Sequence, residues 1–81
     1  MLILREEKII DNDNIIDSNI RRIRLEKGIG QTELVKQLQL MDVDITREIL
    51  VKIESGKHHI KLEQLKNIKK LLNVDYIELF G

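Results

Sequence analysis

The stretch ITREILVKIESGK, at residues 45–57, has the pattern of a short amphipathic helix. Three of its apolar residues are spaced so that they can face one core: Ile45, Leu50 and Ile53. Thr46 stands where a hydroxyl can cap the first turn, and Gly56 stands where glycine commonly ends a helix. The sequence therefore predicts a helix that begins at Thr46 and is closed by Ser55-Gly56.

The start of this helix allows two interpretations, because a hydroxyl, a guanidinium and a carboxylate follow one another at Thr46, Arg47 and Glu48. In the first, Thr46 only caps the helix, and Arg47 and Glu48 are solvated residues of the first turn. In the second, the three side chains are directed at a ligand outside the protein. The rest of the chain bears on this choice.

Helical periodicity continues on both sides of this stretch. Three apolar stripes recur at spacings of three and four: Ile16, Ile20 and Ile23; Leu34, Leu38 and Met41; and Leu62, Leu65, Ile68 and Leu72. The predicted helix ends are Asp13 or Asn14 and Lys27-Gly28 for the first helix, Gly30 for the second, and Asp75 for a last, short YIELF helix. We therefore predict an all-α fold with five helices in one domain over residues 15–81, preceded by an N-terminal arm over residues 1–14.

The first ten residues do not follow the helical pattern. The segment LILREEKII, at residues 2–10, has apolar ends around a charged middle. Three interpretations are open for it: a short strand, an arm packed on the domain, or a piece of a dimer interface.

Composition limits the class of protein. The chain has 81 residues, of which 42% are hydrophobic and 35% charged, a balance typical of a folded soluble domain. It has no cysteine, which excludes disulfides and thiolate metal sites. No apolar run approaches the roughly 18 residues of a membrane helix, and the N-terminal apolar patch is too short for a signal peptide. We therefore expect a cytoplasmic protein that does not contact a membrane.

Charge is unevenly distributed although the net charge is zero. Residues 1–20 contain two basic residues against five acidic ones, a net charge of −3, whereas residues 47–70 contain seven basic residues against three acidic ones, a net charge of +4. A local basic surface matters more for binding nucleic acid than the total charge does.

Three motifs together resemble the Cro/repressor-type helix-turn-helix family, also called lambda-repressor-like domains. They are SNIRRIRLEKGIGQTELVKQL, ITREILVKIESGK and KLEQLKNIKKLLNVDYIELF, and the resemblance covers roughly residues 15 to 80. It implies a compact five-helix lambda-repressor-like fold whose second and third helices form the DNA-binding unit. The implied function is that of a sequence-specific transcriptional regulator of double-stranded DNA, a repressor of phage or mobile-element type. Because one reading helix covers only a half-site, we expect a homodimer on an inverted-repeat operator.

Four residues match the family positions that read bases: Thr46, Arg47, Glu48 and Lys52. The resemblance implies that they enter the major groove, where arginine suits the O6 and N7 atoms of guanine and glutamate can accept from cytosine N4. The alternative for Glu48 is a surface pair with Lys52, four residues further on the same helix face.

Four more residues resemble supporting positions of the family. Gln31 and Lys57 match phosphate-contacting positions, and Gln31 opens a helix whose N-terminal N–H groups favour an anion. A solvated lysine is the alternative for Lys57. Arg24 and Glu54 each stand beside a buried stripe, which favours a partly buried ion pair that joins the first and third helices; the family has such a pair at these positions.

Two departures from the family pattern go together. Val35 stands where the family has alanine or glycine, and about five additional residues, QLMDV, precede Asp44. A longer turn at residues 39–44 can hold the third helix farther away and leave room for the valine. Ile49 replaces a small polar residue, and it either contacts a thymine methyl group or packs against the enlarged turn.

Catalysis has little support in the sequence. His58 and His59 are adjacent, and neighbouring loop residues rarely converge on one ion, whereas zinc needs three or four ligands. No hydroxyl–histidine–acid constellation and no phosphate-binding glycine loop is present. We expect no enzyme, metal or cofactor. The alternative function is a protein-interaction module or an antitoxin on the same fold, because fold alone does not determine function.

Overall fold

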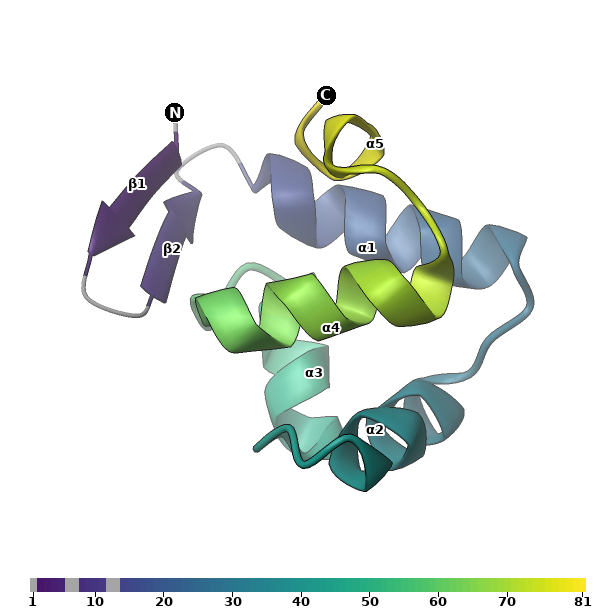
Figure 1. Cartoon of the computed structure of the whole chain (residues 1–81). Helices are drawn as coiled ribbons and strands as arrows, with labels where there is room; N and C mark the ends of the chain where they lie inside the picture. Colours follow the sequence, from purple (N-terminus) through teal and green to yellow (C-terminus); the bar gives the residue numbers. More distant parts are fainter. Residues whose placement is uncertain (1, 6–7, 12–13) are drawn as a thin grey trace.

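The computed structural model describes residues 2–5, 8–11 and 14–81 (Figure 1). Its elements are β1 (Leu2–Arg5), β2 (Lys8–Asp11), α1 (Ile15–Glu26), α2 (Gln31–Leu40), α3 (Arg47–Glu54), α4 (Leu62–Leu72) and α5 (Tyr76–Phe80). The prediction of a compact helical fold is confirmed, and the described residues form the five expected helices. Asp13, one of the two predicted caps of the first helix, lies outside the described residues.

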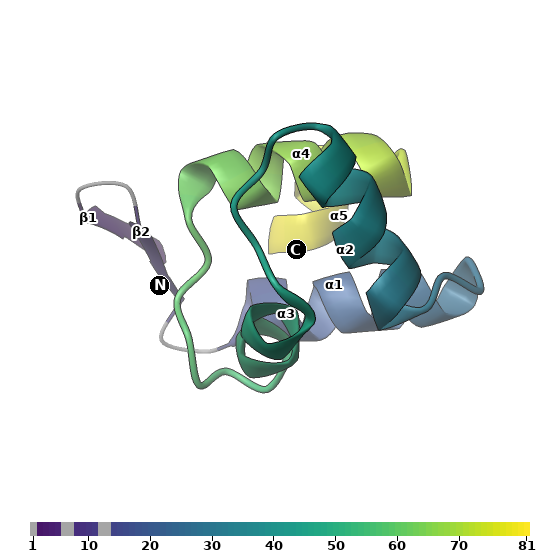
Figure 2. The same cartoon turned by 90° about the horizontal axis from the view of Figure 1, so that it is seen from below.

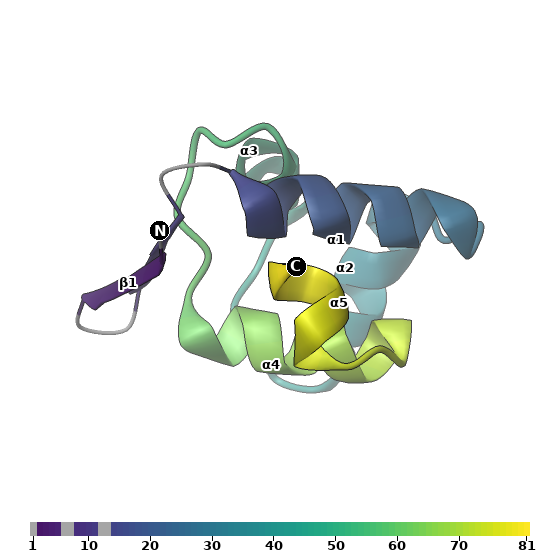
Figure 3. The ribbon, with the colours of Figure 1, turned by 90° about the horizontal axis from the view of Figure 1, so that it is seen from above.

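The helices enclose one apolar core. α1 packs against α3 and α5, and α2 packs against α3 and α4. Seen from above, α5 lies between α1 and α4 (Figure 3). Every helix contributes fully buried side chains, among them Ile16, Ile20, Leu34, Leu38, Leu50, Ile53, Leu65, Ile68, Leu72 and Leu79. Because burying one such side chain stabilises the fold by about 1.5–3 kcal/mol, this core is the main reason that these short helices persist.

Two residues that were predicted to face the core, Met41 and Leu62, are exposed. α2 ends at Leu40, so Met41 already belongs to the turn and no longer follows the helical period. Leu62 is the first residue of α4 and is exposed, whereas Ile60, two residues earlier in the preceding loop, is buried. The prediction was wrong at these positions because both lie at a helix end, where the apolar period no longer decides which side chain is buried.

The connection between α2 and α3 is also part of the core. In the view from below it passes around the end of α2 to reach α3 (Figure 2). Its residues Val43 and Ile45 are buried, and Val43 donates its backbone N–H to the carbonyl oxygen of Leu38. Asp42 has a positive φ of 62°, which lets the chain turn at the end of α2. Val35 is buried as well, so the domain accommodates a valine there.

The N-terminal segment is a two-stranded antiparallel ribbon in which Ile3 lies opposite Ile10 and Leu4 opposite Ile9. The backbone N–H of Ile9 donates to the carbonyl oxygen of Ile60 at 2.9 Å, and Ile9 is buried. An isolated two-stranded ribbon is only marginally stable in water. The strand and the packed arm, two of the three open interpretations, are therefore both realised.

No helix in the described part of the chain has the length and apolar character needed to cross a membrane.

Candidate nucleic-acid interface

One face of α3 is buried against the rest of the domain. Leu50 and Ile53 are fully buried, Glu54 is buried, and the partly buried Ile49 packs against the core. Of the two interpretations of Ile49, packing is therefore the one that the structure supports. The remaining four residues of the helix are exposed, and they form its outer face: Arg47, Glu48, Val51 and Lys52.

The cap predicted for this helix is present. The Oγ1 atom of Thr46 accepts a hydrogen bond from the backbone N–H of Ile49 at 3.2 Å. Thr46 itself is exposed, so the cap lies at the edge of the outer face. Arg47 and Glu48, which follow the cap in the first turn of α3, are exposed as well.

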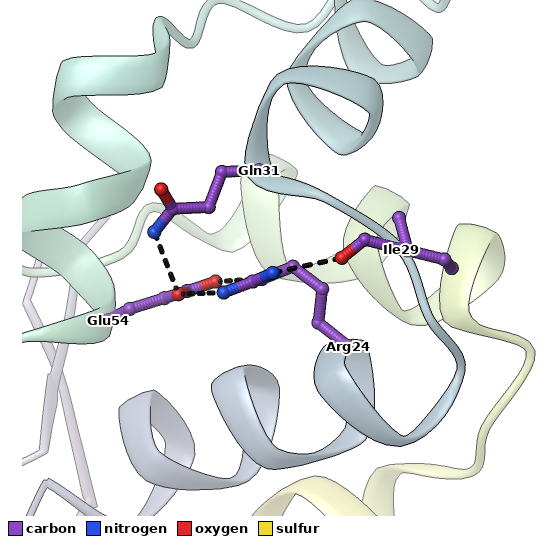
Figure 4. Close-up of polar contacts among 4 residues, drawn as sticks. All are labelled: Arg24, Ile29, Gln31 and Glu54. Carbon is purple, nitrogen blue, oxygen red and sulfur yellow. Dashed lines mark hydrogen bonds and ion pairs between the residues drawn. The ribbon is translucent and has the colours of Figure 1, made fainter.

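The buried end of α3 is joined to α1 by the predicted ion pair (Figure 4). The Nε atom of Arg24 donates to Oε2 of Glu54 at 2.8 Å, and a second guanidinium nitrogen donates to Oε1 at 2.9 Å. A third nitrogen donates to the carbonyl oxygen of Ile29 at 2.9 Å. Hydrogen bonding to Glu54 raises the pKa of Arg24, against the opposing effect of its burial. The pair holds the third helix on the first.

Gln31 completes this cluster. Its amide nitrogen Nε2 donates to Oε1 of Glu54 at 3.2 Å, so the side chain turns toward the ion pair (Figure 4). The phosphate contact predicted for Gln31 stays a prediction.

A second cluster, which the sequence did not reveal, positions the connection before α3. The buried Gln64 of α4 donates from Nε2 to the carbonyl oxygen of Asp44 at 3.0 Å and accepts from the backbone N–H of Lys61 at 2.9 Å. Gln39 of α2 donates to the carbonyl oxygen of Ile45 at 2.9 Å. The longer turn is thus tied to two helices just before the helix cap.

The exposed charged side chains of α3 differ in whether they have an ion-pair partner. Glu48 and Lys52 approach each other at 3.5 Å, as the alternative interpretation of Glu48 anticipated. Arg47 makes no ion pair or side-chain hydrogen bond to any described residue of the chain. Its guanidinium is therefore free to bind an outside partner.

Val51 is an exposed residue that sequence reasoning missed. It follows Arg47 by four residues and therefore shares its side of the helix. That spacing was the signal that could have revealed it. Because Val51 is apolar, the search for buried apolar residues does not mark it as a residue of the exposed face.

The loop after α3 carries Lys57, His58 and His59. Lys57 and His59 are exposed and His58 is half-buried. The backbone N–H of Lys57 donates to the carbonyl oxygen of Lys52 at 2.8 Å, which closes the end of α3. Among the residues that the structure describes, no group of three histidine, cysteine or acidic side chains is placed to hold a metal ion.

Comparison with protein-family models, with curated proteins and with solved structures finds no match to this chain.

Proposed function

We propose that this chain is a sequence-specific double-stranded DNA-binding transcriptional regulator, a repressor of phage or mobile-element type, which reads the major groove with α3. The proposal includes a lambda-repressor-like helix-turn-helix formed by α2 and α3. It is supported by the order of the five helices, by the packing of α2 against α3, and by the family resemblance of the sequence. Binding of this kind requires no cofactor and no catalytic residue.

The observation that carries the proposal is the state of Arg47. It occupies the first position of a helix whose opposite side is buried and whose far end is held by two charged hydrogen bonds. The guanidinium of Arg47 has no partner among the described residues, and the helix that carries it is held in place, so it can meet a planar acceptor pair without breaking an internal contact. The O6 and N7 atoms of guanine form such a pair in the major groove.

Charge supports the same proposal. Residues 47–70, with a net charge of +4, include α3, the following loop and most of α4. In the proposed complex the N-terminus of α2 and the side chain of Lys57 contact phosphates on either side of the groove, which sets register without reading bases. Affinity should therefore fall steeply as the salt concentration rises.

A single α3 covers only one half-site, so we propose that the protein acts in the cytoplasm as a homodimer on an inverted repeat. The test is selection from a random duplex-DNA pool at about physiological salt, where non-specific binding is only ~10⁻⁴–10⁻⁶ M. An enriched inverted repeat supports the proposal, and the spacing of its halves gives the separation of the two α3 helices. Failure of the folded protein to enrich any motif contradicts it.

Variants assign the site within the same experiment. Arg47→Ala and Lys52→Ala should each weaken binding to the selected duplex, and Arg47→Ala should lose about 1–3 kcal/mol and relax the preference at one base pair. Arg21→Ala is the matched control, because it removes an equal charge from an exposed position on α1. If Arg47→Ala binds as Arg21→Ala does, the assignment of the site is wrong.

A second candidate function is supported by a different surface. On α5, Tyr76, Ile77 and Phe80 are exposed, and the two aromatic rings stack with centroids 5.6 Å apart. Exposed apolar side chains on one short helix favour a protein contact, as expected for an interaction module or an antitoxin. Selection that enriches no DNA motif would favour this candidate.

A further inference from the structure

The outer face of α3 presents an apolar side chain beside Arg47, which pairs with no residue that the structure describes. Val51 is 40% exposed, whereas the neighbouring Ile49 packs against the core. Glu48 and Lys52 lie further round the helix and pair with each other. The side of α3 that carries Arg47 therefore combines one free guanidinium with one exposed isopropyl group.

The spacing of these two groups matches neighbouring base pairs. Four residues advance a helix by about 6 Å along its axis. Successive bases of one strand are separated by about 3.4 Å. A helix that places Arg47 against the edge of a guanine therefore brings Val51 to a base one or two steps away.

The chemistry of Val51 selects among the bases that it can meet. In the major groove thymine presents a C5-methyl group, whereas cytosine presents an N4 amino donor. An isopropyl group buries the methyl favourably but leaves the amino group without a hydrogen-bond partner. We infer that Val51 determines specificity by contacting the 5-methyl group of a thymine one or two base pairs from the guanine bound by Arg47. This inference rests on the proposed function.

The test removes only the methyl group. In the duplex obtained by selection, each thymine is replaced in turn by deoxyuridine, and dissociation constants are measured for the wild type, Val51→Ala and Leu62→Ala. Leu62, on α4, is the matched control because its exposure of 39% is nearly that of Val51. Thermal unfolding followed by circular dichroism verifies that each variant is folded.

Replacement at one or two positions should weaken wild-type binding about fourfold, the effect of exposing one methyl group to water. The same replacement should leave the affinity of Val51→Ala unchanged and should affect Leu62→Ala as it affects the wild type. Strong, sequence-specific binding that is insensitive to deoxyuridine at every position would overturn the inference while leaving the proposed function intact. An equal loss in the wild type and Val51→Ala would also overturn it, since another residue would then contact the methyl group. Absence of any sequence-specific binding would overturn both.

Discussion

Among the described residues, two ion pairs involve α3, and they differ in distance and in exposure to solvent. Arg24 and Glu54 meet at 2.8 Å with side chains that are 7% and 3% exposed. Lys52 and Glu48 meet at 3.5 Å with side chains that are 51% and 79% exposed. In the first pair each charge depends on its partner, because water cannot replace it. In the second, water competes for both charges, and the pair contributes at most about 1 kcal/mol.

This difference indicates that the inner side of α3 stabilises the fold, whereas the outer side is available for binding. The buried pair connects α1 to the end of α3 and fixes the direction of the helix. The exposed pair can open at little cost, which leaves Glu48 and Lys52 available to an outside ligand. Changes on the inner side should therefore appear in the free energy of unfolding, and changes on the outer side in binding.

The largest effect should come from breaking the buried pair. Glu54→Ala leaves the guanidinium of Arg24 buried without its carboxylate, and we expect a loss of about 3–5 kcal/mol in the free energy of unfolding. Urea denaturation followed by circular dichroism measures it. Glu48→Ala is the matched control and should change stability by no more than about 1 kcal/mol.

The double variant Arg24→Met/Glu54→Leu sharpens this result. It removes both charges and fills the space with apolar groups, so it should recover most of the stability lost in Glu54→Ala. Equal, small losses in Glu54→Ala and Glu48→Ala would show that the distinction between the two pairs is wrong.

A smaller loss in the free energy of unfolding is expected when a buried and a more exposed uncharged side chain are compared. Gln64 is buried and hydrogen-bonds two backbone groups, whereas the side chain of Gln37, within the described part of the chain, bonds only to the exposed Glu33. Gln64→Ala removes two part-buried hydrogen bonds, to the N–H of Lys61 and the carbonyl of Asp44, at an expected loss of about 1–3 kcal/mol, since each such bond contributes roughly 0.5–1.5 kcal/mol. Gln37→Ala should lie within about 0.5 kcal/mol of the wild type in the same denaturation experiment. Similar losses in the two variants would contradict the role given to burial.

The smallest of the three effects belongs to the helix cap. Thr46 lies at the surface, but its Oγ1 atom accepts from the backbone N–H of Ile49. Thr46→Ala should reduce the free energy of unfolding by about 1 kcal/mol, the usual effect of losing an N-cap. Thr32→Ala, an exposed threonine inside α2, is the control. If Thr46→Ala and Thr32→Ala have the same melting temperature, the side chain of Thr46 does not stabilise α3.

The inner side of α3 was easier to predict from sequence than the outer side. Arg24 and Glu54 could be paired in advance because each stands beside a buried stripe, which directs both charges into the contact between two helices. Val51 was missed because exposure of one apolar residue depends on where neighbouring helices stop. Met41 and Leu62 were misplaced for a related reason, since both lie at helix ends where the periodic pattern no longer applies.

By itself, the sequence determined the five helices, most of their buried faces and the cap at Thr46. These are local properties, decided by periodicity and by residues within one turn of each other. Only the tertiary structure decided the distant partners of polar groups: the turn of Gln31 toward Glu54, and the bond from Gln64 to Asp44 across 20 positions of the chain. Such partners depend on the packing of whole helices, because a buried donor bonds whichever acceptor the core brings within reach.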